Sequence, residues 1–339
     1  MGGIVVLALA LWQLRIVLAL LLVAFTIAAA MRPGVEWLKG RGVPRAIGVL
    51  LHYLGLAALV ALFLWFVVPR AVTQVNTALS GIPTTSSGLS HAASHSTGIK
   101  HQILVGLQRR LKHLPAAGKL VHPALTITLK AFEVLVGIFF VLAAAAYWVF
   151  EREAAMHLVT STIPRPNRKI VRDTWILIDL KLGAYVRGQG LLVLLVGVVL
   201  SLVFWAVGEP YWILVGSFAG LVEIIPVIGP LAAGVLAVGV GFTSSWHVAL
   251  FAGIAVLVVR QLEDFLIAPR VLGGAVGLSP LLVMVSVFAM GFLFGGVSVP
   301  LAIPLVAVIA TLVDVIVRDK DPAGEEVPTV LFTAKESEG

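Results

Sequence analysis

Cysteine is absent from the 339 residues of this chain, and charged residues are scarce. Without cysteine there is no disulfide, no thiolate chemistry and no cysteine-ligated metal. Charged residues make up 12% of the chain, against about a quarter in soluble globular domains. Phosphate-binding Gly-rich loops, nucleophile elbows and zinc-protease motifs are also missing. We therefore expect no enzyme, no ATP-driven pump, no cofactor and no metal site.

Apolar residues dominate what is present. They make up 60% of the chain, and the mean hydropathy is +1.05. Several apolar runs are long enough to cross a bilayer, where only helices and closed barrels satisfy their backbone hydrogen bonds. The sequence predicts an all-α, polytopic integral membrane protein. The net charge of +7 lies mainly in loops, where anionic lipid headgroups explain it without a nucleic acid partner.

Polar stretches divide the chain into segments. The first apolar segment is predicted as one long helix or as a hairpin bent near residues 12–15. The predicted segments are N-terminal transmembrane segments with a basic loop at 31–45 (1–68), a helical and loop region (69–130), a transmembrane helix (131–150), an amphipathic connection (151–175), a C-terminal transport core (176–317) and a disordered tail (318–339).

Lysine and arginine in short loops predict the orientation. The basic stretches 31–45 and 151–175 are expected in the cytoplasm, as is the C-terminal tail. Region 69–130 then lies outside the cytoplasm, although it is basic, because long loops translocate largely regardless of charge. Within it, His91 and His95 are one helical turn apart, but no further ligand has convincing spacing for a metal.

The apolar run 211–242 is interrupted at its centre. Pro226, Gly229 and Pro230 make a continuous helix there very unfavourable, and Glu223 precedes the break by about one helical turn. Carbonyl groups freed by such a break must find partners in protein or in a water-filled cavity. The break therefore indicates either a place where a polar solute is held or the turn of a tight helical hairpin.

A second interrupted run, 280–317, resembles the first. Paired Gly- and Pro-interrupted hydrophobic segments are a sequence pointer to a transporter's binding site. Small residues also serve helix packing, so the two explanations remain open here as well. The residues predicted to break or gate this second segment are Gly295, Gly296, Pro300 and Pro304.

Glu223 is the ionisable residue lying deepest within apolar sequence. A charge at the bilayer centre costs about 2.5–3.5 kcal/mol on insertion scales, so such residues usually face a cavity or a partner. We expect Glu223 to bind a cation, a proton or a polar solute beside the break. The alternatives are that it caps backbone amides near Pro226 or lies at headgroup level.

A second polar group follows at 260–270. Asp264 and Glu263 stand four and three residues after Arg260, so ion pairs on one helix are geometrically easy. Together with Gln261, these acids form either a cytoplasmic gate or an anchor at the membrane interface. Pro269 and the following glycine pair are expected to end the helix.

These stretches also carry a family resemblance. The sequences EIIPVIGPLAAGVLAV and QLEDFLIAPRVLGGAVGLSP, with RPGVEWLKGRGVPR and YVRGQGLLVLL before them, resemble the autoinducer-2 exporter (AI-2E) family over almost the whole chain. The resemblance implies a bacterial inner-membrane permease of about eight spans that forms homo-oligomers. Members are linked either to export of the signal autoinducer-2 or to sodium- or lithium-for-proton antiport.

Together, residues and resemblance predict a multi-pass inner-membrane permease that exports a small polar solute such as autoinducer-2. One alternative is a monovalent cation/proton antiporter, and another is a non-transporting membrane scaffold. The expected partners are membrane lipids, the transported solute or cation, and further copies of the chain. The residues predicted to contact the cargo are Glu223, Pro226, Gly229, Pro230, Gln261, Glu263 and Asp264.

Overall fold

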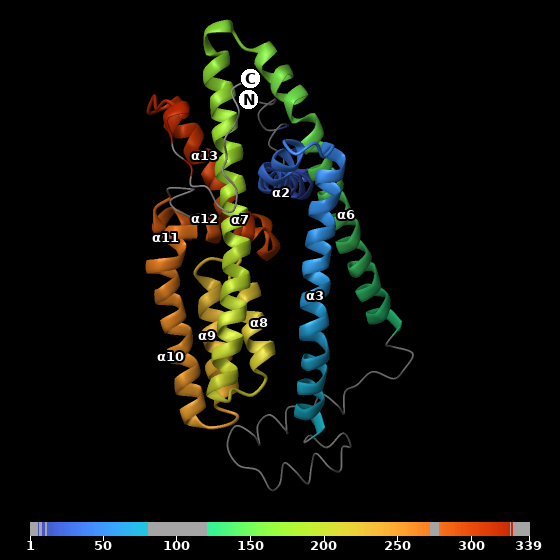
Figure 1. Cartoon of the computed structure of the whole chain (residues 1–339), viewed down its shortest axis with the longest axis vertical. Helices are drawn as coiled ribbons and strands as arrows, with labels where there is room; N and C mark the ends of the chain where they lie inside the picture. Colours follow the sequence, from blue (N-terminus) through green and yellow to red (C-terminus); the bar gives the residue numbers. More distant parts are fainter. Residues whose placement is uncertain are drawn as a thin grey trace. The chain divides into compact units, whose positions relative to one another are not determined.

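The protein is a chain of apolar helices (Figure 1). The computed structural model describes residues 12–80, 121–271 and 278–325, with residues 6, 9, 10 and 327. Five of the described helices are long and apolar enough to cross a membrane, and shorter apolar helices accompany them. The prediction of an all-α polytopic membrane protein is therefore confirmed. The expectations for His91 and His95, and for most of the C-terminal tail, fall outside the described residues.

The longest helices continue past the apolar runs that predict them. α2 runs to Lys39, so much of the stretch expected as a loop at 31–45 is helical, and the chain turns only at 40–44. Gly42 has a φ of +88° in that turn. The helix before α2 breaks at Leu14, within the stretch where a bend was one expectation. The long helices are α2 (Arg15–Lys39), α3 (Arg45–Ser80), α6 (Val121–Thr162) and α7 (Arg168–Val207).

The chain divides into two compact units. One contains residues 1–63 and 139–339, and the other contains residues 64–138. In the second unit the far part of α3 is solvent- or lipid-facing, and Arg70 folds back over the ring of Phe66, with 5.3 Å between the guanidinium carbon and the ring centroid. All the interactions that form the candidate site lie in the first unit.

The interrupted run 211–242 forms a helical hairpin. α8 (Trp212–Val222) and α9 (Ile228–Gly241) pack against each other; α8 packs on α7, α9 packs on α10 (Trp246–Leu262), and α7 and α10 contact each other as well. The turn of a helical hairpin is therefore observed, and a polar-solute site at the break stays a prediction. At 1.5 Å per residue α8 is about 16 Å long and α9 about 21 Å long, which is shorter than a hydrocarbon core of about 30 Å.

Glycine ends α7 before the hairpin begins. Gly208 takes a left-handed conformation at φ +77°, and the amide of Glu209 donates to the carbonyl of Phe204 at 2.8 Å. This is the Schellman arrangement that commonly terminates helices. It turns the chain directly into α8.

Small residues join α7 to α8. A Cβ atom on Gly220 would lie 2.6 Å from the Cα of Gly197, and one on Gly216 would lie 2.2 Å from the Oγ of Ser201. The two helices therefore meet along a Gly-x-x-x-Gly stripe on α8 and a Gly-x-x-x-Ser stripe on α7. Such stripes let membrane helices approach backbone to backbone.

The second interrupted run also folds into packed pieces. α12 (Pro280–Phe294) is followed by the 3₁₀ segment η4 (Gly296–Leu301) and by α13 (Ala302–Ile316). The break is at Gly295, whose φ is +88°, and the Ser298 hydroxyl lies 2.6 Å from the Gly295 carbonyl oxygen. Pro300 lies inside η4 and Pro304 in the first turn of α13, where a missing amide is tolerated.

The start of the C-terminal tail packs on α7. The short 3₁₀ turn η5 (Pro322–Gly324) contacts α7, and Lys181 of that helix pairs with Glu325 at 2.7 Å. Lys181 also donates to the hydroxyl of Thr311 at 3.3 Å. The tail, expected to be disordered from residue 318, is therefore folded at least to Glu325.

Candidate functional site

The tip of the α8–α9 hairpin is a tight, strained turn. Val227 has φ +67° and ψ −52°, and the amide of Ile228 donates to the carbonyl of Pro226 at 2.7 Å. This is the rare γ-turn of positive φ, and a β-branched residue adopts it only when its surroundings impose it. Strain of this kind clusters at ligand clamps and switch regions.

Gly229 lets the two arms of the hairpin touch. A Cβ atom there would lie 2.0 Å from the carbonyl oxygen of Val222. Pro230 falls in the first turn of α9, and Pro226 lies within the turn itself. The predicted helix-breaking residues therefore build the tip, and Glu223 ends α8 beside it.

An ion-pair cluster forms beside the tip. The guanidinium of Arg260 lies 3.2 Å from the carboxylate of Glu223, 3.3 Å from that of Glu263 and 3.0 Å from that of Asp264. Glu223 comes from the end of α8, Arg260 from α10, and the other two acids from the turn that follows α10. The expected pairing of Arg260 with Glu263 and Asp264 is confirmed, and Glu223 joins the same cation.

The charged side chains of this cluster differ in how far they are buried. The side chains of Glu223 and Glu263 are each 6% exposed, whereas Arg260 is 30% and Asp264 is 45% exposed. Three ionised carboxylates against one guanidinium leave a net charge of −2. In a low-dielectric surrounding, like charges this close favour uptake of a proton or a cation. The cluster can therefore bind and release a proton or a cation that reaches it.

A side chain of α7 fastens the tip. Gln189 donates its amide to the backbone carbonyl of Glu223 at 2.8 Å, which satisfies a carbonyl that the helix end leaves free. Gln189 is about 24 Å along α7 from Trp205, at 1.5 Å per residue. Because Trp205 and Trp246 are exposed near the base of the hairpin, that base fits the aromatic belt of a membrane interface. With the base at the interface, we expect the tip to lie within the apolar layer.

Glu263 and Asp264 lie in a widened helical turn directly after α10. Residues Glu263–Ile267 form a π-helical turn before α11 (Ala268–Val271), and the amide of Ala268 donates to Glu263. Pro269 has no amide to continue an α-helical ladder, and the π turn accommodates this loss. The helix therefore continues through Pro269 to Val271, and the glycine pair at 273–274, which was expected to end it together with Pro269, falls outside the described residues.

The remaining predicted residues divide into two groups. Gln261 is exposed on α10, about 100° around the helix from Arg260, and lies apart from the ion pairs. Ile225 of the hairpin tip packs against the apolar cluster around the second break, which includes Met290, Val299 and Leu301. The two interrupted segments are thus brought together. The assignments of Gly295, Gly296, Pro300 and Pro304 as gating residues stay predictions.

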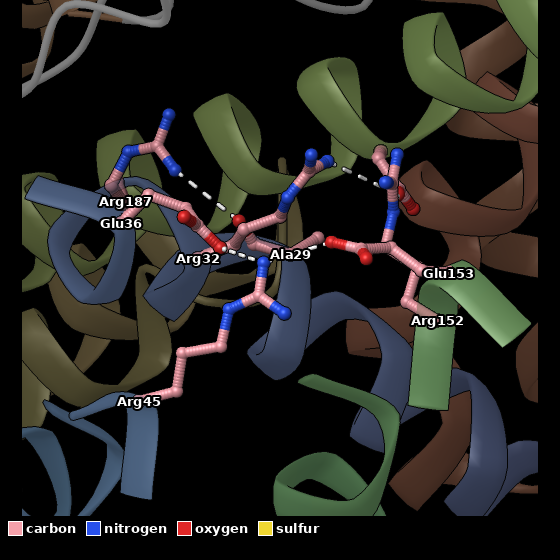
Figure 2. Close-up of polar contacts among 8 residues, drawn as sticks. Ala29, Arg32, Glu36, Arg45, Arg152, Glu153 and Arg187 are labelled. Atoms are coloured by element: carbon pink, nitrogen blue, oxygen red, sulfur yellow. Dashed lines mark hydrogen bonds and ion pairs between the residues drawn. The ribbon is translucent and has the colours of Figure 1, made fainter. Parts of the chain in front are cut away.

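A second polar cluster joins the ends of other helices (Figure 2). Arg45 of α3 lies 3.0 Å from Glu36 of α2 and 2.8 Å from Glu153 of α6. Arg152, whose side chain is 7% exposed, pairs with Asp179 of α7. Arg187 donates to the carbonyl of Ala30 at 3.2 Å. These ion pairs cross-link α2, α3, α6 and α7, and sequence reasoning did not predict them.

Metal binding finds no support in the part of the chain that is described. Among those residues no group of three or more histidines, cysteines or acids is arranged to hold a metal ion. The three acids of the hairpin cluster are each paired with Arg260, so they are suited to protons, monovalent cations or hydrogen-bonding solutes.

Comparison with known proteins agrees with this architecture. The family model described as "AI-2E family transporter" matches residues 2–318. In Bacillus subtilis, the protein named "Putative transport protein YrrI" is 27% identical over 86% of this chain and 84% of its own length. A second from that organism, "Putative transport protein YueF", is 29% identical over 88% of this chain and 84% of its own.

A mycobacterial relative is similar to the same extent. The Mycobacterium tuberculosis protein "Putative transport protein MT0215" is 29% identical over 90% of this chain and 85% of its own length. The family match covers nearly the whole chain and includes both interrupted segments. The chain belongs to the AI-2E family of transporters, as a multi-pass membrane protein whose two interrupted segments meet through Ile225 and the apolar cluster around the second break.

Proposed function

We propose that the protein is a proton-linked permease that exports a small polar solute, such as autoinducer-2, from the cytoplasm. The observation that carries this proposal is the meeting of Glu223, Glu263 and Asp264 on the single cation Arg260 at the tip of a short hairpin. Carboxylates and a guanidinium offer both acceptors and donors to a hydroxyl-bearing solute. Their excess negative charge couples binding to a proton.

Orientation and assembly form part of the proposal. Basic residues of the turn after α2 and of the α6–α7 junction favour the cytoplasmic side of a bacterial inner membrane. The C-terminus then lies in the cytoplasm as well. Further copies of the chain and the surrounding lipids are the proposed partners, since many large apolar side chains of the single chain are exposed.

A monovalent cation/proton antiporter is the second candidate function. It is favoured by the surplus of two negative charges in the same cluster, because such a site attracts sodium or lithium without needing hydroxyl groups on the cargo. Export measured in everted vesicles separates the two. Autoinducer-2 is followed in parallel with sodium and lithium, with the pH recorded on both sides of the membrane.

Glu223→Gln tests the role of the cluster in transport. The amide keeps the shape of the side chain and removes the ionisable group, so we expect export to fall at least tenfold and to lose its dependence on pH. The measurement is uptake into everted vesicles over a range of pH, with equal amounts of protein in the membrane. Glu151→Gln, on an exposed position of α6, is the matched control. Unchanged rate and pH profile in Glu223→Gln would exclude the cluster as the site.

Cysteine labelling distinguishes a transporter from a scaffold. Because the natural chain has no cysteine, each introduced thiol is unique. We expect Ile224→Cys, at the tip, to react with a membrane-impermeant charged reagent, since a transport site must be reached by water. Val235→Cys is the control, because Val235 is 76% exposed in the chain and lies two turns along the apolar helix α9, where we expect lipid to cover it. Equal protection of both thiols would favour the scaffold.

A further inference from the structure

One buried acid lies away from the hairpin cluster. Glu209 is 2% exposed and occupies the short connection between α7 and α8, at the base of the hairpin. Among the described residues, neither of its carboxylate oxygens has a hydrogen-bond partner. An isolated ionised carboxylate in such a place is very costly, so the group is neutral unless a ligand reaches it.

The surroundings of Glu209 are backbone and small side chains. One carboxylate oxygen lies 3.1 Å from where a Cβ on Gly241 would be, and that glycine is packed against Ala249. The ends of α7 and α9 and the starts of α8 and α10 thus converge around the acid. The titratable groups that these helix ends carry are Tyr211 and His247, and His247 is exposed, with its ring tilted by 33° against that of Trp246.

Neighbouring tryptophans indicate the depth of Glu209 in the membrane. Exposed Trp205 and Trp246 flank it, which fits the membrane–water interface. Glu223 lies at the other end of α8, about 16 Å away at 1.5 Å per residue. One hairpin therefore has a buried carboxyl at its base and a buried pair of carboxyls at its tip.

We propose that Glu209 is a second proton-binding group of the transporter, through which protons enter or leave the α7–α10 bundle at the base of the hairpin. This inference rests on the proposed proton-linked function. Burial raises the pKa of Glu209 to about 7, so the group changes its charge within the ordinary range of environmental pH. A proton released there needs no partner ion, because water at the interface accepts it.

Because the pKa of Glu209 is raised, the folded state loses stability as the pH rises. Below a pH of about 4.5 the carboxyl is protonated in the folded and unfolded states alike, and it costs nothing. As the pH rises towards 7, the unfolded state ionises first, so the folded state loses stability until the buried carboxyl also ionises. Glu209→Gln removes this loss.

The test is the pH dependence of thermal unfolding in lipid nanodiscs, with export measured in parallel. We expect the Tm of the wild type to fall between pH of about 4.5 and about 7, and Glu209→Gln to flatten this fall and raise the Tm at the upper end. Its export should shift its pH midpoint by at least about one unit, since one of the two proton-binding groups has been removed. Glu151→Gln is the control and should match the wild type in both measurements.

Each outcome has a separate meaning. The same slope of Tm against pH in Glu209→Gln and wild type would overturn the assignment of Glu209 as a buried proton site. A flattened slope with an unchanged export profile would overturn its part in transport. If the wild type exported nothing, or did so without regard to pH, the proposed function would fail, while the unfolding data would still report on Glu209.

Discussion

Arg260→Ala should abolish export and lower the stability of the folded protein by about 3–5 kcal/mol, the usual cost of leaving buried charges without their partner. Arg260 is the cation that contacts all three acids of the cluster. Without it, Glu223 and Glu263 remain buried beside each other with no compensation. The measurements are uptake into everted vesicles and unfolding in a graded denaturant series.

Two further variants make the Arg260 prediction specific. Arg260→Lys keeps the charge but loses the planar fork that reaches several carboxylates, so stability should be partly retained while export falls. Arg260→Ala combined with Glu223→Gln and Glu263→Gln removes the two buried uncompensated charges and leaves only the exposed Asp264, so it should recover stability without recovering export. If Arg260→Ala alone were as stable and as active as the wild type, the cluster would be neither a structural nor a transport element.

Gly229→Ala should be the most damaging single-methyl substitution in the hairpin. The added Cβ would lie 2.0 Å from the carbonyl oxygen of Val222 and 3.2 Å from the amide nitrogen of Glu223. Both contacts are with backbone, so α8 and α9 must separate at the tip and move Glu223 away from Arg260. We expect a loss of about 3 kcal/mol, at the upper end for overpacking, together with loss of export.

Gly239→Ala provides the matched control on the same helix. A Cβ at Gly239 meets nothing within 4 Å, and alanine favours a helix over glycine by up to about 1 kcal/mol. Gly239→Ala should therefore be neutral or slightly stabilising, with normal export. Thermal unfolding of the two variants side by side checks the difference. Equal effects would show that the close approach at Gly229 does not constrain the hairpin.

Local chemistry made part of this site predictable. Proline and glycine at 226–230 break a helix wherever they stand, and acids three and four residues after Arg260 share its face. The contact of Glu223 with Arg260 spans 37 positions in sequence and could not be predicted. Apolar helices in lipid carry little amphipathic pattern to say which faces meet, so the partnership with Gln189 also escaped prediction.

Helix ends were the least predictable features. Hydropathy detects the part of a helix that lies in hydrocarbon, but α2 continues beyond it through Pro33 to Lys39, and α6 continues to Thr162. The helix continues through Pro269 because a π turn precedes the proline, and composition alone does not predict a π turn. The strained Val227 is similar, because a β-branched residue at positive φ is imposed by its surroundings.

The shortness of α8 and α9 has a consequence for topology. A hairpin whose arms are about 16 and 21 Å long turns back before the far side of a core of about 30 Å. It adds no net crossing, so the connections before α8 and after α9 must face the same compartment. Reporter tags inserted at Pro210 and at Ser244 should be accessible from one side of the membrane only, and from the same side. Counting this run as two ordinary spans leaves the parity of the chain unchanged but places Glu223 on the wrong side of the membrane.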